Sequence, residues 1–386
     1  MQKKKIAVIV ASNIYNRKGL FNAAHERIKR LMLYEDYDIT PFVISKYYPW
    51  HVRLLTRSKS VERPNKYIVD GIEYNIIWLK NTLLDFVLMH KLNRPPIVAY
   101  SDFRHYVNQF GKYDLIISHS CAEYAHIINT ETGVPYIATW HGSDIHTLGF
   151  LSPSYTAETK SSIEGAVHNF FVSNDLLCKS DKICNEASKS VSYNGKDFSF
   201  VQFDSAKRNQ LKSELCPDKD VVIFVGNIIE VKNVKALPGI FRHIHEKHPN
   251  VEFWIVGKGN LQAELESNTR DLPMKFWGNV EHSRIPDLLN VASVLVLPSL
   301  NEGLPLTTVE ALGCGCNVVG SRVGGIAEAI GIENTFPLEL PDFEESLAER
   351  CIYFLEKHIS PSLPKVFDWD VCVSNEVSVI NKIIKQ

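Results

Sequence analysis

Short apolar strands alternate with amphipathic stretches of helix length along almost the whole of this 386-residue chain. Such alternation is typical of a parallel β-sheet covered by helices. The pattern occurs twice, on either side of a polar stretch at residues 198–219 that has little strand character. The chain is long enough for two domains, each with its own core. The sequence therefore predicts an α/β protein of two doubly wound, Rossmann-like domains.

The predicted strands fall into two sets. The first set is Ile6–Ala11, Ile39–Ser45, Leu115–His119, Tyr136–Trp140, Phe170–Ser173 and Ser190–Tyr193. The second set is Val221–Val225, Val251–Val256, Lys275–Trp277, Val294–Leu297 and Asn317–Gly320. Residues 68–80 predict an antiparallel hairpin that turns at Asp70-Gly71, a strong two-residue turn signal. We expect domains over residues 1–200 and 201–365, with a C-terminal helix over 366–386 that packs back on the first domain.

Charge is distributed unevenly along the chain. Residues 1–112 hold 19 Lys and Arg against 9 Asp and Glu, whereas the remainder holds 23 against 35. Such blocks indicate a surface for a charged partner. The eight cysteines include no CxxC pair, which favours reduced, buried thiols and a reducing cytoplasm. The first apolar run is too short for a secretion signal, and no run reaches the roughly 20 residues of a membrane span.

Residues 46–61 combine basic and aromatic side chains without an acid. They contain Lys46, Tyr47, Tyr48, Trp50, Arg53, Leu54, Leu55, Arg57 and Lys59. This composition is typical of an element that lies on an anionic bilayer. The alternative is a loop with a solvated, charged face. Nucleic acid is a third option, but no nucleic-acid-binding motif accompanies the charge. We therefore expect a peripheral contact with an anionic membrane surface and no nucleic-acid partner.

Two glutamates flank a predicted strand-to-helix corner in the second half of the chain. Glu302 follows the strand Val294–Leu297, and Glu310 comes eight positions later, in a helix that we expect to start near Leu306. A helix N-terminus presents unpaired N–H groups and can receive a phosphate. Carboxylates beside it would repel the phosphate, so they more plausibly bind sugar hydroxyls. The alternative is an ordinary corner with an acidic first turn.

Other predicted strands also end in polar residues. Lys232 arrives where a helix begins after the strand that ends at Gly226, and could neutralise a diphosphate there. Gly257 starts a Gly-x-Gly turn that permits close approach of a ligand. His141 and Asp144 follow a strand of the first domain. A solvated lysine, a tight turn, a structural histidine and a helix-capping aspartate are the respective alternatives.

The segment Tyr15-Asn-Arg17-Lys18-Gly19-Leu20 lies between the first strand and the first helix. It is placed to add backbone N–H groups and positive charge to an anion site. Ligands of open doubly wound sheets bind beyond the carboxyl ends of the strands, where all of these groups are expected. Taken together, they predict a site for a nucleotide diphosphate-sugar between the two domains.

These residues resemble the retaining glycosyltransferases of family 4, which have the GT-B fold. The family hallmark is Glu-x7-Glu, here Glu302 and Glu310, followed by Ala311-Leu-Gly-Cys-Gly-Cys-Asn-Val-Val and Val323-Gly-Gly-Ile-Ala-Glu328. The likeness extends to His141-Gly-Ser-Asp144, Val172-Ser-Asn174, Asn194-Gly-Lys-Asp197, Phe276-Trp-Gly-Asn-Val280 and Phe367-Asp-Trp369. The start Lys18-Gly19-Leu-Phe is similar to enzymes of bacterial surface-polysaccharide or teichuronic acid assembly.

The resemblance implies two Rossmann-like domains that face an interdomain cleft, the first for the acceptor and the second for the donor. His141, Lys232 and Glu302 would then be catalytic: His141 and Glu302 by the donor sugar, Lys232 on the leaving diphosphate. The donor-binding residues would be Gly19, Asn227, Gly257, Val280, Leu306, Thr307 and Glu310. Among them, Glu310 would bind the ribose, Val280 the base, and the amides of Leu306 and Thr307 the distal phosphate. Asp144 and Lys18 would contact the acceptor or support the site.

One departure from the family pattern concerns the diphosphate. The family usually has Arg directly after the glycine and Glu before the lysine, where this chain has Asn227 and Val231, with Glu230 one position earlier. Loss of a charge-assisted hydrogen bond to phosphate costs about 1.5–3 kcal/mol when nothing replaces it. Lys18 or Arg17 is a candidate to supply the missing charge.

The resulting hypothesis is a cytoplasmic glycosyltransferase of hexosyltransferase type, peripheral on the inner face of the plasma membrane. It would move a sugar from a UDP-sugar to a lipid-linked glycan or polysaccharide precursor of a bacterial capsule or cell envelope. The resemblance implies no metal and no other cofactor. The alternative is a catalytically weakened, nucleotide-sugar-binding partner subunit of a glycosyltransferase complex, which Asn227 motivates.

Overall fold

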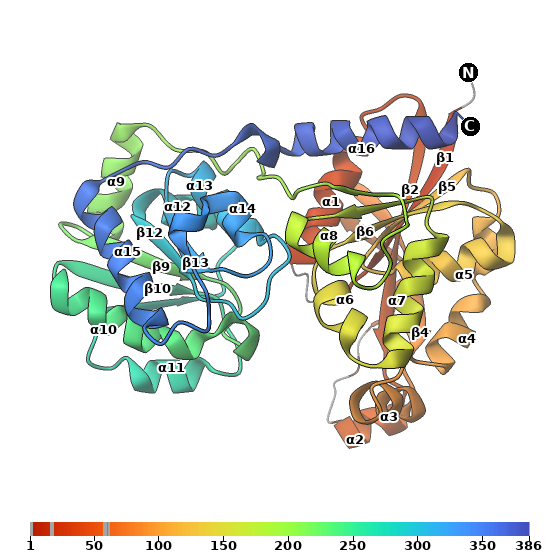
Figure 1. Cartoon of the computed structure of the whole chain (residues 1–386), viewed down its shortest axis with the longest axis horizontal. Helices are drawn as coiled ribbons and strands as arrows, with labels where there is room; N and C mark the ends of the chain where they lie inside the picture. Colours follow the sequence, from red (N-terminus) through yellow and green to blue (C-terminus); the bar gives the residue numbers. More distant parts are fainter. Residues whose placement is uncertain (1–2, 16–18, 57–59, 61, 386) are drawn as a thin grey trace. The chain divides into compact units, whose positions relative to one another are not determined.

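The structure, a computed structural model, describes residues 3–15, 19–56, 60 and 62–385 (Figure 1). It divides into two compact units. The first unit comprises Met1–Tyr193 together with Trp369–Gln386, and the second unit comprises Asn194–Asp368. Each unit is built on a largely parallel β-sheet, so the predicted α/β class with two Rossmann-like domains is confirmed.

The first unit contains an eight-stranded sheet in the order β3-β4-β2-β1-β5-β6-β7-β8. Its strands are β1 (Lys4–Ala11), β2 (Tyr37–Tyr47), β3 (Lys66–Val69), β4 (Ile72–Lys80), β5 (Leu115–His119), β6 (Tyr136–Trp140), β7 (His168–Phe171) and β8 (Lys189–Val191). Every neighbouring pair is parallel except β3 and β4. Asp70 and Gly71 form the turn between these two with φ values of 48° and 78°, so the predicted hairpin is confirmed.

Nine α-helices are described in the first unit. They are α1 (Gly19–Leu31), α2 (Trp50–Thr56), α3 (Leu83–Lys91), α4 (Val98–Arg104), α5 (Ala122–Thr132), α6 (Ser143–His146), α7 (Pro153–Gly165), α8 (Asn174–Asp181) and α16 (Trp369–Ile384). None of the described helices of the chain is long and apolar enough to cross a membrane.

The second unit has a six-stranded, all-parallel sheet in the order β11-β10-β9-β12-β13-β14. Its strands are β9 (Asp220–Val225), β10 (Val251–Val256), β11 (Met274–Gly278), β12 (Val294–Leu297), β13 (Asn317–Ser321) and β14 (Thr335–Phe336). Its helices are α9 (Ser205–Leu215), α10 (Leu237–Lys247), α11 (Gln262–Asn268), α12 (Ile285–Val291), α13 (Leu306–Gly313), α14 (Ile326–Ile330) and α15 (Phe343–Lys357).

The division between the units falls seven residues before the boundary expected at residue 200. The segment after Tyr193 is tied to the second unit by hydrogen bonds. Asn194 Nδ2 donates to the carbonyl oxygen of Leu304 at 2.9 Å, and the amide of Lys196 donates to that of Phe367 at 3.0 Å. The polar stretch at residues 198–219, which has little strand character, contains α9, a helix that was not predicted; it buries only Leu211 and so carries almost no apolar periodicity.

Helix α16 belongs to the first unit, where it lies against α1 (Figure 1). Val373, Val377 and Ile380 follow helical spacing along one face of α16 and are buried in the core with strands β1 and β5. Full burial of such side chains contributes about 1.5–3 kcal/mol each. The last segment of the chain is thereby held to the first unit by an apolar stripe.

A buried ion pair strengthens this attachment. Arg27 Nε of α1 donates to Glu376 Oε1 of α16 at 2.8 Å, and the two side chains are 0% and 4% exposed. The same guanidinium donates to the carbonyl oxygens of Ser192 and Tyr193, both at 3.0 Å, and lies 4.8 Å from the ring centroid of Trp369. Arg27 therefore joins the first helix, the last helix and the end of the first unit's main segment.

Substitution Arg27→Met should lower the free energy of unfolding of the first unit by about 3–5 kcal/mol, because Glu376 is left as an unpaired buried charge. Urea unfolding of the full chain, followed by tryptophan fluorescence, measures this. Arg104→Met is the matched control, since Arg104 and Glu131 form an exposed pair whose loss should change stability by less than about 1 kcal/mol. Equal effects of the two substitutions would contradict the role given to Arg27.

Candidate functional site

The carboxyl ends of β9, β10 and β12 carry the predicted donor-site residues of the second unit. Strand β9 lies between β10 and β12 in the sheet, and all three are parallel, so their carboxyl ends share one edge. Lys232 follows β9, Gly257 follows β10, and Glu302 follows β12. The strand order reverses between β9 and β12, which is where an open sheet of this type leaves a crevice for ligands.

Lys232 and Glu302 form an ion pair at this edge. Lys232 Nζ lies 2.5 Å from Glu302 Oε1, and the two side chains are only 19% and 11% exposed. The backbones that carry them are also joined, because the amide of Leu300 donates to the carbonyl oxygen of Val231 at 2.9 Å. The structure therefore brings together two residues that are 70 positions apart in the sequence.

Two glycines allow the loops of this edge to pack backbone against backbone. Gly257 has φ +129°, and a Cβ atom there would lie 1.9 Å from the carbonyl oxygen of Gly226. Gly324 has φ +53°, and a Cβ atom there would lie 1.9 Å from the carbonyl oxygen of Glu302. Side chains at either position would collide with backbone in a conformation that L-residues rarely adopt. The first glycine holds the loop of Asn227, and the second holds the loop of Glu302.

Helix α13 begins directly after this loop. Its N-terminal flank, Pro305, provides no side-chain cap, and Leu306 and Thr307 are half-buried in its first turn. The first backbone N–H groups of a helix lack intrahelical partners and carry a partial positive charge. The start of α13 therefore has the character of an anion site.

Glu310 lies in the same helix and is 5% exposed. Its Oε1 atom is 3.5 Å from His282 Nε2, and the ring of His282 packs edge-on against Phe200 at 5.1 Å between centroids. His282 was missed by the sequence reasoning. It follows Val280 by two residues, and Val280, half-buried after β11, was expected to meet a nucleotide base. The position of this histidine, two residues after Val280, is the sequence signal that could have identified His282.

Asn227 is exposed at the end of β9, with no positive charge of its own. The neighbouring loop supplies a cation that the sequence reasoning also missed. Lys258 is exposed, its carbonyl oxygen accepts from the amide of Ile228 at 3.1 Å, and its Cε lies 3.1 Å from the position of a Cβ on Gly278. The backbone of Lys258 is therefore joined to the residue after Asn227, while its side chain lies against Gly278. Lys18 and Arg17, the candidates named from sequence, lie outside the described residues.

In the first unit, His141 follows β6 and meets a second histidine. His119 Nδ1 at the end of β5 lies 3.2 Å from His141 Nε2. Burial lowers the pKa of both imidazoles well below the usual 6.5, with a further contribution to both from the positive charge of Arg27. His119 is fully buried, and its Nε2 atom has no hydrogen-bond partner among the described residues. The two rings form a neutral, hydrogen-bonded pair near pH 7.

Asp144 shapes the loop that presents His141. Its carboxylate accepts from the amides of His141 at 3.1 Å, Gly142 at 2.9 Å and Ile145 at 3.1 Å, and from the hydroxyl of Ser120 at 2.7 Å. The side chain is thus occupied in holding the turn around Gly142, whose φ is 146°. This geometry gives Asp144 a positioning role for His141.

Gly19 lies at the start of the first helix, and a cluster of possible metal ligands lies on the surface of the second unit. Gly19 is the exposed first residue of α1. In the part of the chain that the structure describes, one cluster has metal-ligand spacing, formed by His243, Glu345 and Glu349. It lies on α10 and α15, and Glu349 already bonds to His243 and Lys247. Its partners are those of a surface ion-pair network.

Residues 219–357 match the family described as glycosyl transferases group 1. The chain is 26% identical over 243 residues, or 61% of its length, to a teichuronic acid biosynthesis glycosyltransferase, TuaC of Bacillus subtilis, of which it covers 59%. It is 26% identical over 192 residues, or 47% of its length, to a phosphatidylinositol N-acetylglucosaminyltransferase GPI3 subunit of Saccharomyces cerevisiae, of which it covers 41%. The chain thus spans about half the length of these curated relatives.

The fold as a whole matches solved glycosyltransferase structures. Anabaena Alr3699/HepE, solved in complex with UDP, aligns with a TM-score of 0.68 at 18% identity, over 99% of this chain and 98% of that one. By sequence and by fold, this chain has the GT-B architecture and resembles the bacterial surface-polysaccharide glycosyltransferases, with residues 219–357 carrying its likeness to glycosyl transferases group 1.

Proposed function

We propose that this chain is a retaining glycosyltransferase of hexosyltransferase type, which moves a sugar from a UDP-sugar to a lipid-linked glycan or polysaccharide precursor. The observation that carries the proposal is the shielded Lys232–Glu302 pair at the carboxyl edge of β9 and β12. The lysine is a partner for the diphosphate of a nucleotide-sugar, and the glutamate is a partner for the hydroxyls of its sugar. HepE, which shares the fold, was solved with UDP and with UDP-glucose.

In the proposed reaction, the bond between the donor's anomeric carbon and its distal phosphate oxygen breaks. A hydroxyl oxygen of the acceptor bonds to the same face of that carbon, and its proton passes to the leaving phosphate. Lys232 and the first amides of α13 stabilise the negative charge that develops on the diphosphate. Glu302 orients the sugar hydroxyls, and Glu310 binds the ribose. Side chains and backbone amides supply this stabilisation, so the proposal assigns no role to a metal.

The proposed setting is the cytoplasmic face of a bacterial membrane, in assembly of a capsule or other envelope polysaccharide. The relative of Bacillus subtilis named for teichuronic acid biosynthesis supports the pathway class. Exposed apolar side chains on α2 support peripheral binding: Trp50, Leu54 and Leu55 are 68%, 72% and 68% exposed. Arg57 and Lys59, which contribute to the basic character of residues 46–61, lie outside the described residues.

Substitution Lys232→Met should lower kcat/KM for sugar transfer by about 10–100-fold, because one charge-assisted hydrogen bond to the leaving phosphate is lost. Transfer from radiolabelled UDP-sugars by the purified full chain measures this. Lys235→Met is the matched control, since Lys235 lies three residues further on and forms an exposed pair with Glu230. Unchanged transfer by both Lys232→Met and Glu302→Gln would refute the mechanism.

The neutral histidine pair makes a prediction about pH. Burial disfavours the protonated forms of His119 and His141, so the folded chain binds fewer protons than the unfolded chain below pH 6.5, and stability falls as the pH drops through that range. Because both pKa values lie well below 6.5, kcat/KM should show no inflection near 6.5 that depends on His141. Profiles of the wild type and His141→Gln test this. An inflection near 6.5 that His141→Gln removes would contradict it.

A second candidate is a partner subunit that binds the nucleotide-sugar without turning it over. Asn227, where the related enzymes usually have Arg, favours it, as does the likeness to relatives named as GPI3 subunits. The enzyme proposal predicts that Asn227→Arg strengthens UDP binding about tenfold and also raises the transfer rate, because it adds a charge-assisted bond to phosphate. Isothermal titration calorimetry and the transfer assay measure the two effects. Tighter UDP binding with no transfer by either protein would favour the partner subunit.

A further inference from the structure

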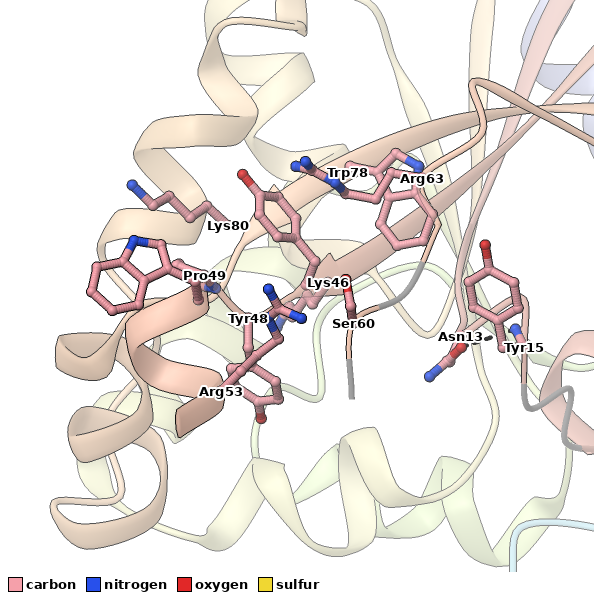
Figure 2. A pocket seen from close by; sticks show the side chains of 12 residues that line it. Asn13, Tyr15, Lys46, Tyr48, Pro49, Arg53, Ser60, Arg63, Trp78 and Lys80 are labelled. Carbon is pink, nitrogen blue, oxygen red and sulfur yellow. Dashed lines mark hydrogen bonds between the residues drawn. The ribbon is translucent and has the colours of Figure 1, made fainter. Parts of the chain in front are cut away.

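A hollow of about 660 Å³ lies at the carboxyl edge of the first unit's sheet, away from the His119–His141 pair (Figure 2). It is bounded by the ends of β2 and β4, by α2, by the loop after β1 and by the segment before β3. Figure 2 shows Lys46, Arg53 and Arg63 around the hollow, with Asn13 and Tyr15 on the side opposite α2. Neither sequence motif nor resemblance identified this pocket as a whole.

Four cations and no carboxylate are among the described residues that line the hollow, although Glu62 and Asp102 lie close to its lining residues Tyr15 and Lys80. Lys46, Arg53, Arg63 and Lys80 form no ion pair with any described residue, and none of the described lining residues is acidic. By contrast, other basic side chains of this unit form ion pairs, such as Arg30 with Glu26 at 2.5 Å. Like charges gathered around one concavity repel one another, and an anion relieves that repulsion.

The nearest buried acids do not cancel this charge. Lys46 acts on the carboxyl groups of Glu123 and Glu158, but burial raises the pKa of Glu123 to about 8 and that of Glu158 to about 7. Both carboxyls are therefore protonated to a large extent near neutral pH. These two carboxyl groups therefore neutralise Lys46 only in part.

Aromatic rings form the other part of the lining, and short contacts hold them in place. The guanidinium of Arg63 lies 4.3 Å from the ring centroid of Tyr47, and Trp78 Nε1 donates to the carbonyl oxygen of Pro64 at 2.8 Å. The hydroxyl of Tyr15 donates to the carbonyl oxygen of Glu62 at 2.6 Å, which ties the loop after β1 to the segment before β3. Flat apolar faces of this kind pack against the C–H faces of sugar rings.

We propose that this hollow binds a phosphate or diphosphate group of the glycan acceptor, with the attached sugar packed on the aromatic rings. Two guanidinium groups and two ammonium groups suit a phosphate, because Arg binds it bidentately and Lys adds charge. The assignment to the acceptor rests on the proposed function, whereas the anion site rests on the pocket alone.

The sheet order fixes how far the phosphate lies from the reacting hydroxyl. Strand β2 is three strands from β6, which precedes His141, and β4 is four strands from it. Neighbouring strands are about 4.8 Å apart, so the cations at the ends of β2 and β4 lie about 14–19 Å from the end of β6. The phosphate is therefore recognised at a distance spanned by a short oligosaccharide rather than by a single sugar.

Calorimetric titration of the full chain with inorganic pyrophosphate, in saturating UDP, tests the site while the donor unit is occupied. The wild type should bind pyrophosphate, and Arg53→Gln/Arg63→Gln should bind it at least about tenfold more weakly. Arg53→Lys/Arg63→Lys keeps the positive charge and should lose less affinity for pyrophosphate.

Lys112→Gln is the control. Lys112 also stacks on a tyrosine, Tyr113, but it precedes β5 and so lies at the amino edge of the sheet, away from the hollow. Equal thermal unfolding of all variants excludes misfolding.

No saturable binding of pyrophosphate, or equal binding by the wild type and Arg53→Gln/Arg63→Gln, would overturn the proposal. A second arm uses vesicles of phosphatidylglycerol and phosphatidylcholine. If the double substitution abolishes vesicle binding but pyrophosphate neither binds nor competes, the hollow contacts a bilayer and the glycan assignment is wrong. Failure of UDP to bind would count against the donor site alone, because the pyrophosphate measurement can still be made without it.

Discussion

Parallel strands deliver their carboxyl ends to one edge of a sheet, and the chemistry proposed for this chain depends on that constraint. In the second unit it places Lys232 after β9 next to Glu302 after β12. In the first unit it places His119 at the end of β5 next to His141 after β6, and it brings Lys46 at the end of β2 near Lys80 at the end of β4. Residues far apart in sequence become neighbours because strand order, rather than chain order, decides which ends meet.

The strands themselves were predictable because they are buried on both faces and read as continuous apolar runs. The turn at Asp70-Gly71 and the close approach at Gly257 were also visible, since both depend on residues that tolerate positive φ. Helix α9 could not be predicted from the sequence, because it buries a single leucine and lacks an apolar stripe. The contacts of His119, Lys258 and His282 depend on side chains that meet across loops, and no local pattern records such meetings. The membrane assignment of residues 46–61 likewise did not anticipate that Lys46 and Arg53 line a hollow together with Arg63 and Lys80.

The proposed donor site and the hollow differ in whether their positive charges are paired. Lys232 is held by Glu302 in a shielded setting, so its ammonium group is fixed in position before any ligand arrives. The four cations of the hollow form no ion pair with a described residue, and Lys46, Arg63 and Lys80 are exposed whereas Lys232 is half-buried. A group that stabilises charge in a transition state gains from being fixed in advance. A group that captures a substrate gains from unneutralised charge, which attracts anions from a distance.

The Lys232–Glu302 pair also links recognition of the two halves of the proposed donor. While they are paired, each satisfies the other, and a diphosphate must compete with Glu302 for Lys232. Once the diphosphate takes Lys232, Glu302 is left as a shielded carboxylate without its partner, which is unfavourable. The hydroxyls of the donor sugar can then donate hydrogen bonds to that carboxylate. A nucleotide diphosphate without its sugar would leave this charge uncompensated, so the exchange of partners favours the intact nucleotide-sugar over the spent nucleotide and promotes release of the product.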